Sequence, residues 1–356
     1  MLQCASVLLS ISPTTNLELD SKSFIREPSY AQRDVKTTTS RTSSRVMGYQ
    51  LATPMMLQLS ESDGAKGQYV GELQERWKFP SDHLPIGATI DGLNYLSWNV
   101  LDPAYMAWVT ELDSQGIGRS MIADEHVYIE GSDLTVRERH IVDMILDMIN
   151  NPNAPKDMVS LQECSPPFLE ELKARLPENF TVIAHGGNAV VVDLSKFDVV
   201  DSKYVSGVFP FQPKRNFQEI TLRRKDTGEL VRIMNVHLPG DPTKHVPELF
   251  AAYLERTHTP GVKSIAMGDM NFTEKDFGSA LSEAFSDPSA YGIFSPYCTN
   301  IDPYSRYSKA IDHFIVLGEA EVSMHHGEDI HESLPYMVDL LGGSFTEELP
   351  LQEQIG

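Results

Sequence analysis

The sequence has few features of membrane-spanning or secreted proteins. No stretch of its 356 residues approaches the roughly 18 consecutive apolar residues that a membrane helix requires. Its three cysteines, Cys4, Cys164 and Cys298, have no metal-binding spacing and cannot all pair with one another, which is typical of a reducing compartment. The first residues are mildly apolar, but no basic residue precedes them, so we expect no secretory signal. We therefore expect an intracellular, cytoplasmic protein.

Positive charge is also scarce. The chain has 29 Lys and Arg residues against 50 Asp and Glu residues, which gives a net charge of −21. A protein this acidic repels a long polyanion unless a local basic patch offsets the field. Among phosphate-containing partners, the charge therefore favours short oligonucleotides, nucleotides and small phosphate esters over long duplexes.

Composition divides the chain into three parts. Residues 1–65 are rich in Ser and Thr, and basic residues cluster between Ser21 and Arg45, so we expect a flexible tail with a targeting or regulatory role, or with none. Residues 66–328 alternate predicted strands and helices and form the expected folded domain. Residues 329–356 are then an appended C-terminal segment. The sequence leaves the oligomeric state open.

Hydrophobic periodicity predicts more strands than helices. Apolar residues at helical spacing predict a helix over Val136–Ile149, and a second helix is expected over 166–176. The predicted strands are 158–162, 180–184, 189–192, 219–222, 230–236, 264–268, 310–317 and 320–324. Several hairpins among them favour mixed or antiparallel sheets over a doubly wound parallel sheet.

A predicted hairpin brings two polar segments together. Asp91-Gly92 separates two apolar, β-prone runs, and this pair favours a two-residue turn because both residues tolerate positive φ. With that turn Ile90 faces Leu93. Continuing the register places His83 opposite Val100, so Asp82, His83 and Asn99 reach the same end of one sheet.

Polar residues end several predicted strands in a recognisable order. The segments are Ser81-Asp-His-Leu-Pro-Ile86, Leu96-Ser-Trp-Asn-Val100, Leu161-Gln-Glu163, Asn235-Val-His-Leu238, Met267-Gly-Asp-Met-Asn271 and Ala310-Ile-Asp-His-Phe314. Together they resemble the motifs of the endonuclease/exonuclease/phosphatase superfamily of metal-dependent phosphoesterases, over roughly residues 75–325. In that superfamily the Ser-Asp-His motif normally lies near the C-terminus. Here it comes first, which indicates circular permutation.

The resemblance implies a fold and an activity. The expected fold is an α/β (α+β) four-layer sandwich of two mostly antiparallel or mixed β-sheets flanked by helices. The implied enzyme is a hydrolase of phosphate esters (EC 3.1) that uses Mg²⁺ or Mn²⁺. Mg²⁺ prefers oxygen ligands and usually binds one or two carboxylates. The resemblance implies Glu163, Asp82 and Asp269 as metal ligands.

The same resemblance implies roles for the other site residues. His83 is the expected general base or electrostatic stabiliser, oriented by Asp312. Asp269 and Asn271 would position the attacking water, and His237 would assist at the phosphate or leaving group. The expected substrate-binding residues are Arg215, Asn99 and Asn271.

Two questions stay open at this stage. In an unpermuted chain, Glu332-Ser333 would occupy the place of Asp-His and the base would be lost. The favoured function is a phosphodiesterase or nuclease acting on single-stranded or short nucleic acid. The alternatives are a phosphomonoesterase or phospholipase-type enzyme on inositol phosphates or sphingomyelin, and a catalytically silent binding module docked through the basic tail.

Overall fold

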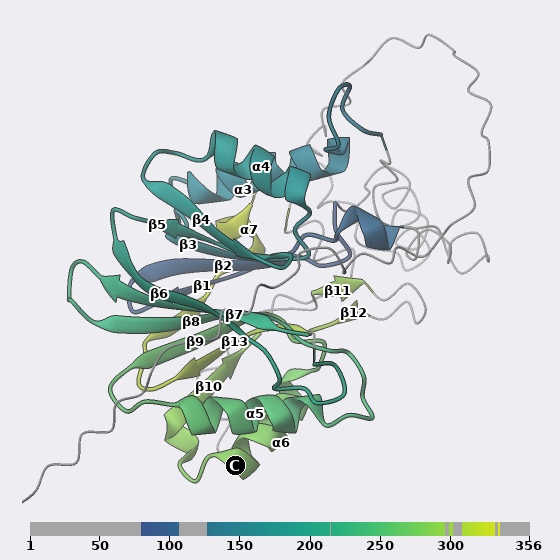
Figure 1. The fold of residues 1–356 in the computed structure, drawn as a ribbon. Helices are drawn as coiled ribbons and strands as arrows, with labels where there is room; N and C mark the ends of the chain where they lie inside the picture. The colour runs from purple at the N-terminus through teal and green to yellow at the C-terminus, as the bar shows by residue number, and fades with distance from the viewer. Residues whose placement is uncertain are drawn as a thin grey trace, which may run out of the picture. The chain divides into compact units, whose positions relative to one another are not determined.

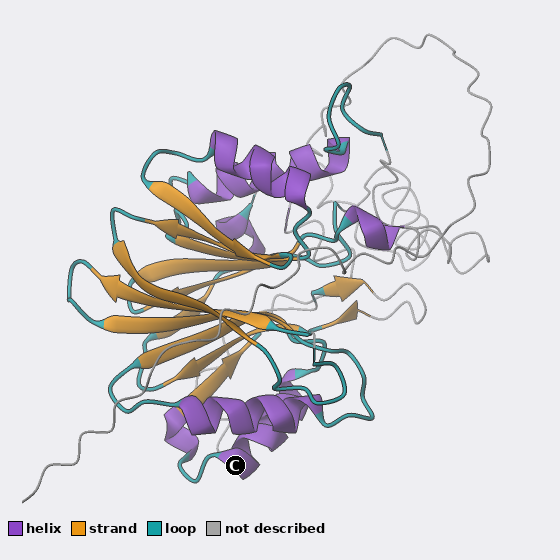
Figure 2. Cartoon of the chain, in the orientation of Figure 1, coloured by secondary structure: helices purple, strands orange, loops and turns teal. Residues whose placement is uncertain are grey.

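The computed structural model describes residues 80–106, 127–213, 215–295, 299–301, 308–331 and 334. These residues belong to one compact unit within 51–356. Two six-stranded sheets pack face to face, and helices cover their outer faces (Figures 1 and 2). The predicted four-layer sandwich is therefore confirmed, and it is the architecture that the superfamily resemblance implies. None of the described helices is long and apolar enough to span a membrane.

The first sheet surrounds the predicted hairpin. In spatial order its strands are β14 (Val322–Met324), β1 (Ile86–Ile90), β2 (Leu93–Asn99), β3 (Met158–Gln162), β5 (Asn188–Asp193) and β4 (Phe180–His185). Only β2 and β3 run parallel among these pairs, so both end at the same edge of the sheet. Helices α3 (Val136–Ile149) and α4 (Pro166–Arg175) lie on its outer face (Figure 1).

The second sheet has a related arrangement. Its strands are β10 (Tyr291–Phe294), β13 (Asp312–Leu317), β9 (Lys263–Asp269), β8 (Leu230–His237), β7 (Phe217–Arg224) and β6 (Phe197–Val205). Here β8 and β9 are the parallel pair. Helices α5 (Val246–Thr257) and α6 (Glu274–Ala284) cover its outer face (Figure 1). The remaining described elements are the 3₁₀ turn Pro288–Ala290, the two-stranded ribbon β11 (Asn300–Ile301) with β12 (Ser308–Lys309), and α7 (Gly327–Ile330).

Apolar side chains from both sheets form one core. Trp98 of β2 is 1% exposed and belongs to the same buried cluster as Ile233 of β8 and Phe314 of β13. A second cluster packs Phe250 of α5 and Phe277 of α6 against the other face of the second sheet. Burial of apolar surface contributes about 25 cal/mol per Å² and is the main force that holds such layers together.

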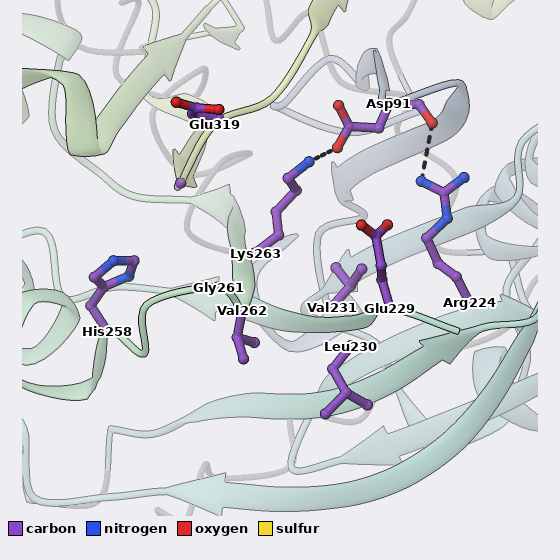
Figure 3. A pocket seen from close by; sticks show the side chains of 11 residues that line it. Asp91, Arg224, Glu229, Leu230, Val231, His258, Gly261, Val262, Lys263 and Glu319 are labelled. Atoms are coloured by element: carbon purple, nitrogen blue, oxygen red, sulfur yellow. Dashed lines mark hydrogen bonds and ion pairs between the residues drawn. The ribbon is translucent and has the colours of Figure 1, made fainter. Parts of the chain in front are cut away.

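The β1–β2 hairpin forms in the predicted register over its paired residues, but the ladder ends before the predicted pairing of His83 with Val100, and His83 instead forms an isolated bridge with Asn300. Ile90 pairs with Leu93, and the ladder continues to Ile86 opposite Ser97. Asp91 (φ 49°) and Gly92 (φ 76°) both adopt the left-handed conformation of a tight hairpin turn. Asp91 also joins the turn to the second sheet, because its carboxylate pairs with Lys263 and its carbonyl accepts from Arg224 (Figure 3).

The C-terminal boundary predicted at residues 328/329 falls inside α7. Ile330 is fully buried in the core beneath β1, and Leu334 is also fully buried. The first residues of the predicted appended segment therefore pack against the sandwich. The predicted tail 1–65 and residues 335–356 lie outside the described residues.

Candidate metal and catalytic site

Four strand ends bring the predicted site residues together at one edge of the sandwich. Asn99 ends β2, Glu163 follows β3, and His237 and Asp269 end β8 and β9 as register partners. The antiparallel strand β13 begins at the same edge, with Asp312 paired to Asp269. The parallel strands end at this edge and the antiparallel strand starts there. Their polar side chains therefore form a single cluster.

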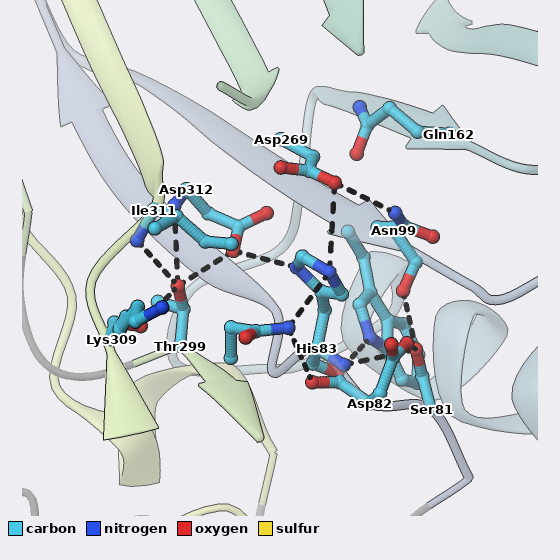
Figure 4. A network of polar contacts seen from close by, with 12 residues as sticks. Ser81, Asp82, His83, Asn99, Gln162, Asp269, Thr299, Lys309, Ile311 and Asp312 are labelled. Atoms are coloured by element: carbon cyan, nitrogen blue, oxygen red, sulfur yellow. Dashed lines mark hydrogen bonds and ion pairs between the residues drawn. The ribbon is translucent and has the colours of Figure 1, made fainter. Parts of the chain in front are cut away.

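His83 reaches this cluster from the segment that leads into β1. Its main-chain carbonyl accepts a hydrogen bond from the indole N–H of Trp98 at 2.8 Å. The ring Nδ1 is 2.9 Å from Asp312 Oδ2, and Nε2 is 3.5 Å from Asp269 Oδ2 (Figure 4). His83 therefore lies at the same end of the first sheet as Asn99, whose Nδ2 contacts the same Asp269 oxygen at 3.0 Å.

Asn99 orients two carboxylates. Its Nδ2 donates to Glu163 Oε1 at 3.1 Å and to Asp269 Oδ2 at 3.0 Å. Its Oδ1 accepts from the main-chain N–H of Leu101 at 3.1 Å, which fixes the orientation of the amide. Asn99 therefore presents N–H donors to the acidic cluster and holds the carboxylates in place.

His237 completes the opposite side of the cluster. Its Nε2 is 3.6 Å from Glu163 Oε1 and 3.5 Å from Asp269 Oδ2. Gly268 makes this approach possible, because a Cβ there would lie 2.0 Å from the carbonyl oxygen of Val236. Any other residue at position 268 would push β9 away from β8.

Two residues at the edge have left-handed backbones. Glu163 has φ 59° and Asn271 has φ 58°. Such conformations cost about 1–3 kcal/mol in residues other than glycine and are concentrated at functional sites. The main-chain N–H of Asn271 donates to Asp269 Oδ1 at 2.9 Å, and its Nδ2 donates to the carbonyl of Leu238 at 2.9 Å.

A buried pair of amides ties the two sheets together beneath the site. Gln162 Nε2 donates to Asn235 Oδ1 at 2.8 Å, and Asn235 Nδ2 donates to the carbonyls of Leu161 and Ala189, both at 2.9 Å. Glu163 directly follows Gln162 in the chain. The amide pair therefore links the first sheet to the second directly beside Glu163.

Burial perturbs the acidic groups of the site in one direction. It raises the pKa of Asp269 to about 7 and also raises the pKa of Glu163 and of Asp82. Buried carboxylates resist ionisation unless a cation compensates their charge. Such a carboxylate cluster, with imidazoles beside it, fits a hard divalent ion.

The two histidines are perturbed in opposite directions. Burial alone would lower the pKa of His83, but the carboxylates of Asp312, Asp269 and Asp82 raise it well above its usual value. Burial, together with the positive charges of Arg215 and His83, lowers the pKa of His237 well below its usual value. The site thus pairs an imidazole that favours its cationic form with one that favours its neutral form.

Two groups of described side chains place their ligand atoms close enough together to hold a metal ion. One consists of Glu163, His237 and Asp269, and the other of His83, Asp269 and Asp312. Asp269 belongs to both. The expected ligand Asp82 belongs to neither. Its Oδ1 lies 3.5 Å from the hydroxyl of Ser81, beside the cluster.

Arg215 lies close to the histidine side of the site. Its Nη2 donates to the carbonyl of Leu238 at 3.3 Å, and its Nε is buried with no hydrogen-bond partner among the described residues. The neighbouring Lys214 and the alternative motif Glu332-Ser333 lie outside the described residues. His313, next to Asp312, is fully buried and contacts the Ser295 hydroxyl and the Phe272 carbonyl.

The structure adds three residues that the motifs did not indicate. Thr299 and Asn300 contact the His83–Asp312 pair from a segment that the sequence leaves as a loop. Arg137 of α3 is 2% exposed and donates to the main-chain carbonyls of Pro80, Val100 and Leu101. Arg137 had a signal in the sequence, because it lies one turn before Ile141 on the apolar face of the predicted helix.

Comparisons with known proteins give fold-level similarity. No family model matches the chain, and no curated protein matches it. The solved structure of a D. rerio TDP2 humanized by 14 mutations is similar at 16% identity and a TM-score of 0.42, over 67% of this chain and 84% of that one. A mannosyl-6-phosphatase from Bacteroides thetaiotaomicron is similar at 18% identity and a TM-score of 0.44, over 64% of this chain and 86% of that one.

A third similar structure is an endonuclease/exonuclease/phosphatase from Bacteroides vulgatus, at 16% identity and a TM-score of 0.42. The similarity covers 66% of this chain and 87% of that one. Similarities at this level say nothing about substrate. The function of the chain is therefore inferred from the geometry of its site.

Proposed function

We propose that this chain is a metal-dependent phosphoesterase whose active site is the cluster around Asp269. One observation carries the proposal. A single carboxylate oxygen, Asp269 Oδ2, accepts from Asn99 at 3.0 Å and lies 3.5 Å from Nε2 of both His83 and His237. Three separate segments thus direct their polar groups at one acidic atom, which is hard to explain as packing alone.

The protein's own groups can divide the chemistry. Glu163 and Asp269 would hold Mg²⁺ or Mn²⁺, which when bound supplies Lewis-acid stabilisation of phosphate charge. Asp269 and Asn271 would position the attacking water for in-line displacement. His83, oriented by Asp312, would stabilise charge on the phosphoryl group in its cationic form or take up a proton in its neutral form, and His237 would act at the leaving oxygen.

We also propose that the motif order reflects circular permutation. The β1–β2 hairpin supports this, because it leads directly from His83 into the strand that ends at Asn99. The tight turn would then join what are the last and first strands of the unpermuted arrangement. Asp82 would serve as an additional ligand if it turns toward the metal.

The preferred substrate is a phosphodiester in short or single-stranded nucleic acid. The net charge of −21 supports small or short substrates. Arg215, whose buried Nε has no hydrogen-bond partner among the described residues, is the expected phosphate contact along with Asn99 and Asn271. Inositol phosphates and sphingomyelin are the alternative substrates.

A substrate panel tests the proposal. Purified full-length protein would be assayed on single-stranded RNA and DNA, abasic duplex, inositol polyphosphates and sphingomyelin, with Mg²⁺ or Mn²⁺ and with EDTA. We expect turnover of the single-stranded nucleic acids that EDTA abolishes and that a Glu163→Gln, His83→Ala double variant lacks. Turnover of inositol compounds alone would overturn the nuclease assignment. If no substrate is turned over, the proposal that the chain is a phosphoesterase is wrong.

A further inference from the structure

Thr299 lies next to Asp312, beside the His83–Asp312 pair (Figure 4). Its side chain is fully buried, and its hydroxyl donates to Asp312 Oδ2 at 2.6 Å. The same carboxylate oxygen is 2.9 Å from His83 Nδ1. Thr299 and His83 therefore share one atom of Asp312 and contact it from different directions.

The direction of the Thr299 hydroxyl proton is fixed by its other contacts. The hydroxyl oxygen accepts from the main-chain N–H of Ile311 at 3.3 Å and of Asp312 at 3.2 Å. A hydroxyl has two acceptor positions and one donor. With both acceptor positions filled, the single proton can go to Asp312 Oδ2 at 2.6 Å or to the Lys309 carbonyl at 3.5 Å, and the much shorter contact is the one to Asp312.

Asp312 depends on this contact because its second oxygen has none. Among the described side chains, Asp312 Oδ1 is buried without a hydrogen-bond partner. The carboxylate plane is therefore held through Oδ2 alone, by His83 on one side and Thr299 on the other. Without Thr299, the only contact that defines the rotation of the Asp312 carboxylate would be the His83 imidazole. The carboxylate could then not fix the orientation of that imidazole.

The main chain of the same residue holds the segment that carries His83. The carbonyl of Thr299 accepts from the N–H of Leu84 at 2.7 Å, and its N–H donates to the carbonyl of Lys309 at 2.9 Å. Asn300 forms a β-bridge with His83 and approaches its Nε2 with Nδ2 at 3.2 Å. Thr299 and Asn300 thus contact both members of the pair.

We propose that Thr299 is a positioning residue for the His83–Asp312 pair, which sets the rotation of the carboxylate and so the direction in which His83 presents Nε2. The role rests on the phosphoesterase function proposed above. It concerns the orientation of the pair and not the binding of substrate. Its loss should therefore lower kcat and leave KM unchanged.

The test compares Thr299→Val with Thr299→Ser. Valine keeps the shape and removes the hydroxyl, whereas serine keeps the hydroxyl. We expect Thr299→Val to lower kcat roughly 10-fold or more, the effect of losing a hydrogen bond to a charged group, and Thr299→Ser to recover most of it. Thr257→Val is the matched control, because its half-buried hydroxyl donates to the Tyr253 carbonyl at 2.8 Å on α5.

A second readout does not depend on activity. The Nδ1–H proton of His83, assigned by its loss in His83→Ala, should give a downfield NMR signal that moves in Thr299→Val and not in Thr299→Ser. If the valine variant fails to fold, Thr299→Ala, which leaves room for water, receives the same measurements. An unmoved signal or an unchanged kcat in a folded variant lacking the hydroxyl would overturn the positioning role. A signal that moves in a protein without phosphoesterase activity would retain the positioning role and reject the proposed function.

Discussion

Replacement of Glu163, a proposed metal ligand, tests metal binding separately from folding. Its carboxylate accepts from Asn99 Nδ2 at 3.1 Å and from the main-chain N–H of Asp102 at 3.2 Å. Glu163→Gln keeps the size of the side chain and removes its charge. We expect Mg²⁺ or Mn²⁺ affinity, measured by calorimetry, to fall by at least roughly 10²-fold, because even residues that only support a ligand often account for 10- to 100-fold.

Glu170→Gln is the control for that substitution. Glu170 is 76% exposed and, among the described residues, pairs with Lys173 alone, on α4 and away from the strand ends. Its replacement should leave metal affinity unchanged. Equal affinities in wild type and Glu163→Gln would show that the ion binds elsewhere.

The sequence allows some of the site residues to be predicted and not others. Glu163, His237 and Asp269 could be predicted as a group because each ends or follows a buried strand within a recognisable motif. Thr299 could not. Its importance comes from meeting Asp312 and Leu84, which lie in other segments, and no periodicity in the neighbouring sequence indicates that meeting.

Helix α3 contributes a buried arginine that binds the main chain next to the site. Arg137 donates to carbonyls of Pro80 and Val100 at 2.7 and 2.9 Å, and these flank the segments that carry His83 and Asn99. Arg137→Met would leave buried carbonyls unpaired. We expect a loss of roughly 3 kcal/mol or more in the free energy of unfolding, measured with urea, and a lower kcat.

Arg139→Met, two residues along the same helix, is the matched control. Arg139 is 48% exposed and pairs with Glu171 at 3.3 Å, and exposed pairs of this kind typically contribute about 1 kcal/mol or less. If both variants lost the same stability, the buried carbonyl contacts of Arg137 would have no special role.

The contact of His325, which directly follows β14, with Thr89 of β1 gives a pH prediction. His325 Nε2 lies 2.8 Å from the Thr89 hydroxyl, which itself donates to Asn94 Oδ1 at 2.6 Å. The hydroxyl oxygen therefore accepts from Nε2–H, and His325 Nδ1 accepts from Lys156 Nζ at 2.9 Å. Burial and the Lys156 charge lower the pKa of this neutral imidazole from 6.5 to about 4.

Because the folded pKa is depressed, the unfolded chain binds the His325 proton first as pH falls. Stability from this group is present above pH 6.5 and is lost as pH falls toward 4. Relative to His325→Gln, the wild type should lose about 3 kcal/mol across that window. Urea unfolding at several pH values measures this. His245→Gln, at an 81% exposed position, should keep the wild-type slope, and an unchanged slope in His325→Gln would contradict the assignment.

The elements themselves were unequally predictable. The helix Val136–Ile149 and the strand Met158–Gln162 have the predicted bounds, since strong periodicity and clear stop signals define them. Helices α5 and α6 and strand β6 were not predicted. In β6 most residues are exposed, so apolar and polar residues do not alternate in the way that marks a half-buried strand.

At the scale of the whole molecule, net charge predicts the response to salt. With a net charge of −21, raising NaCl from about 20 to 200 mM should leave unchanged or lower the KM for a long oligonucleotide, because screening weakens repulsion. The KM for a dinucleotide should change little. A KM that rises steeply with salt would instead indicate a basic binding path. Deleting residues 1–65, which include the basic cluster between Ser21 and Arg45, tests whether the tail supplies it.

The central claim is that the N-terminal Asp82-His83 motif, and not Glu332-Ser333, supplies the catalytic histidine. Its most direct test is kcat on the best substrate of the panel for His83→Ala and Ser333→Ala, each with and without residues 1–65. We predict that His83→Ala lowers kcat by roughly 10²-fold or more, as expected for loss of a positioned acid or base. Asp312→Asn should be a milder form of that defect, and Ser333→Ala and the deletion should leave hydrolysis intact. An essential Ser333 with a dispensable His83 would contradict the permuted site.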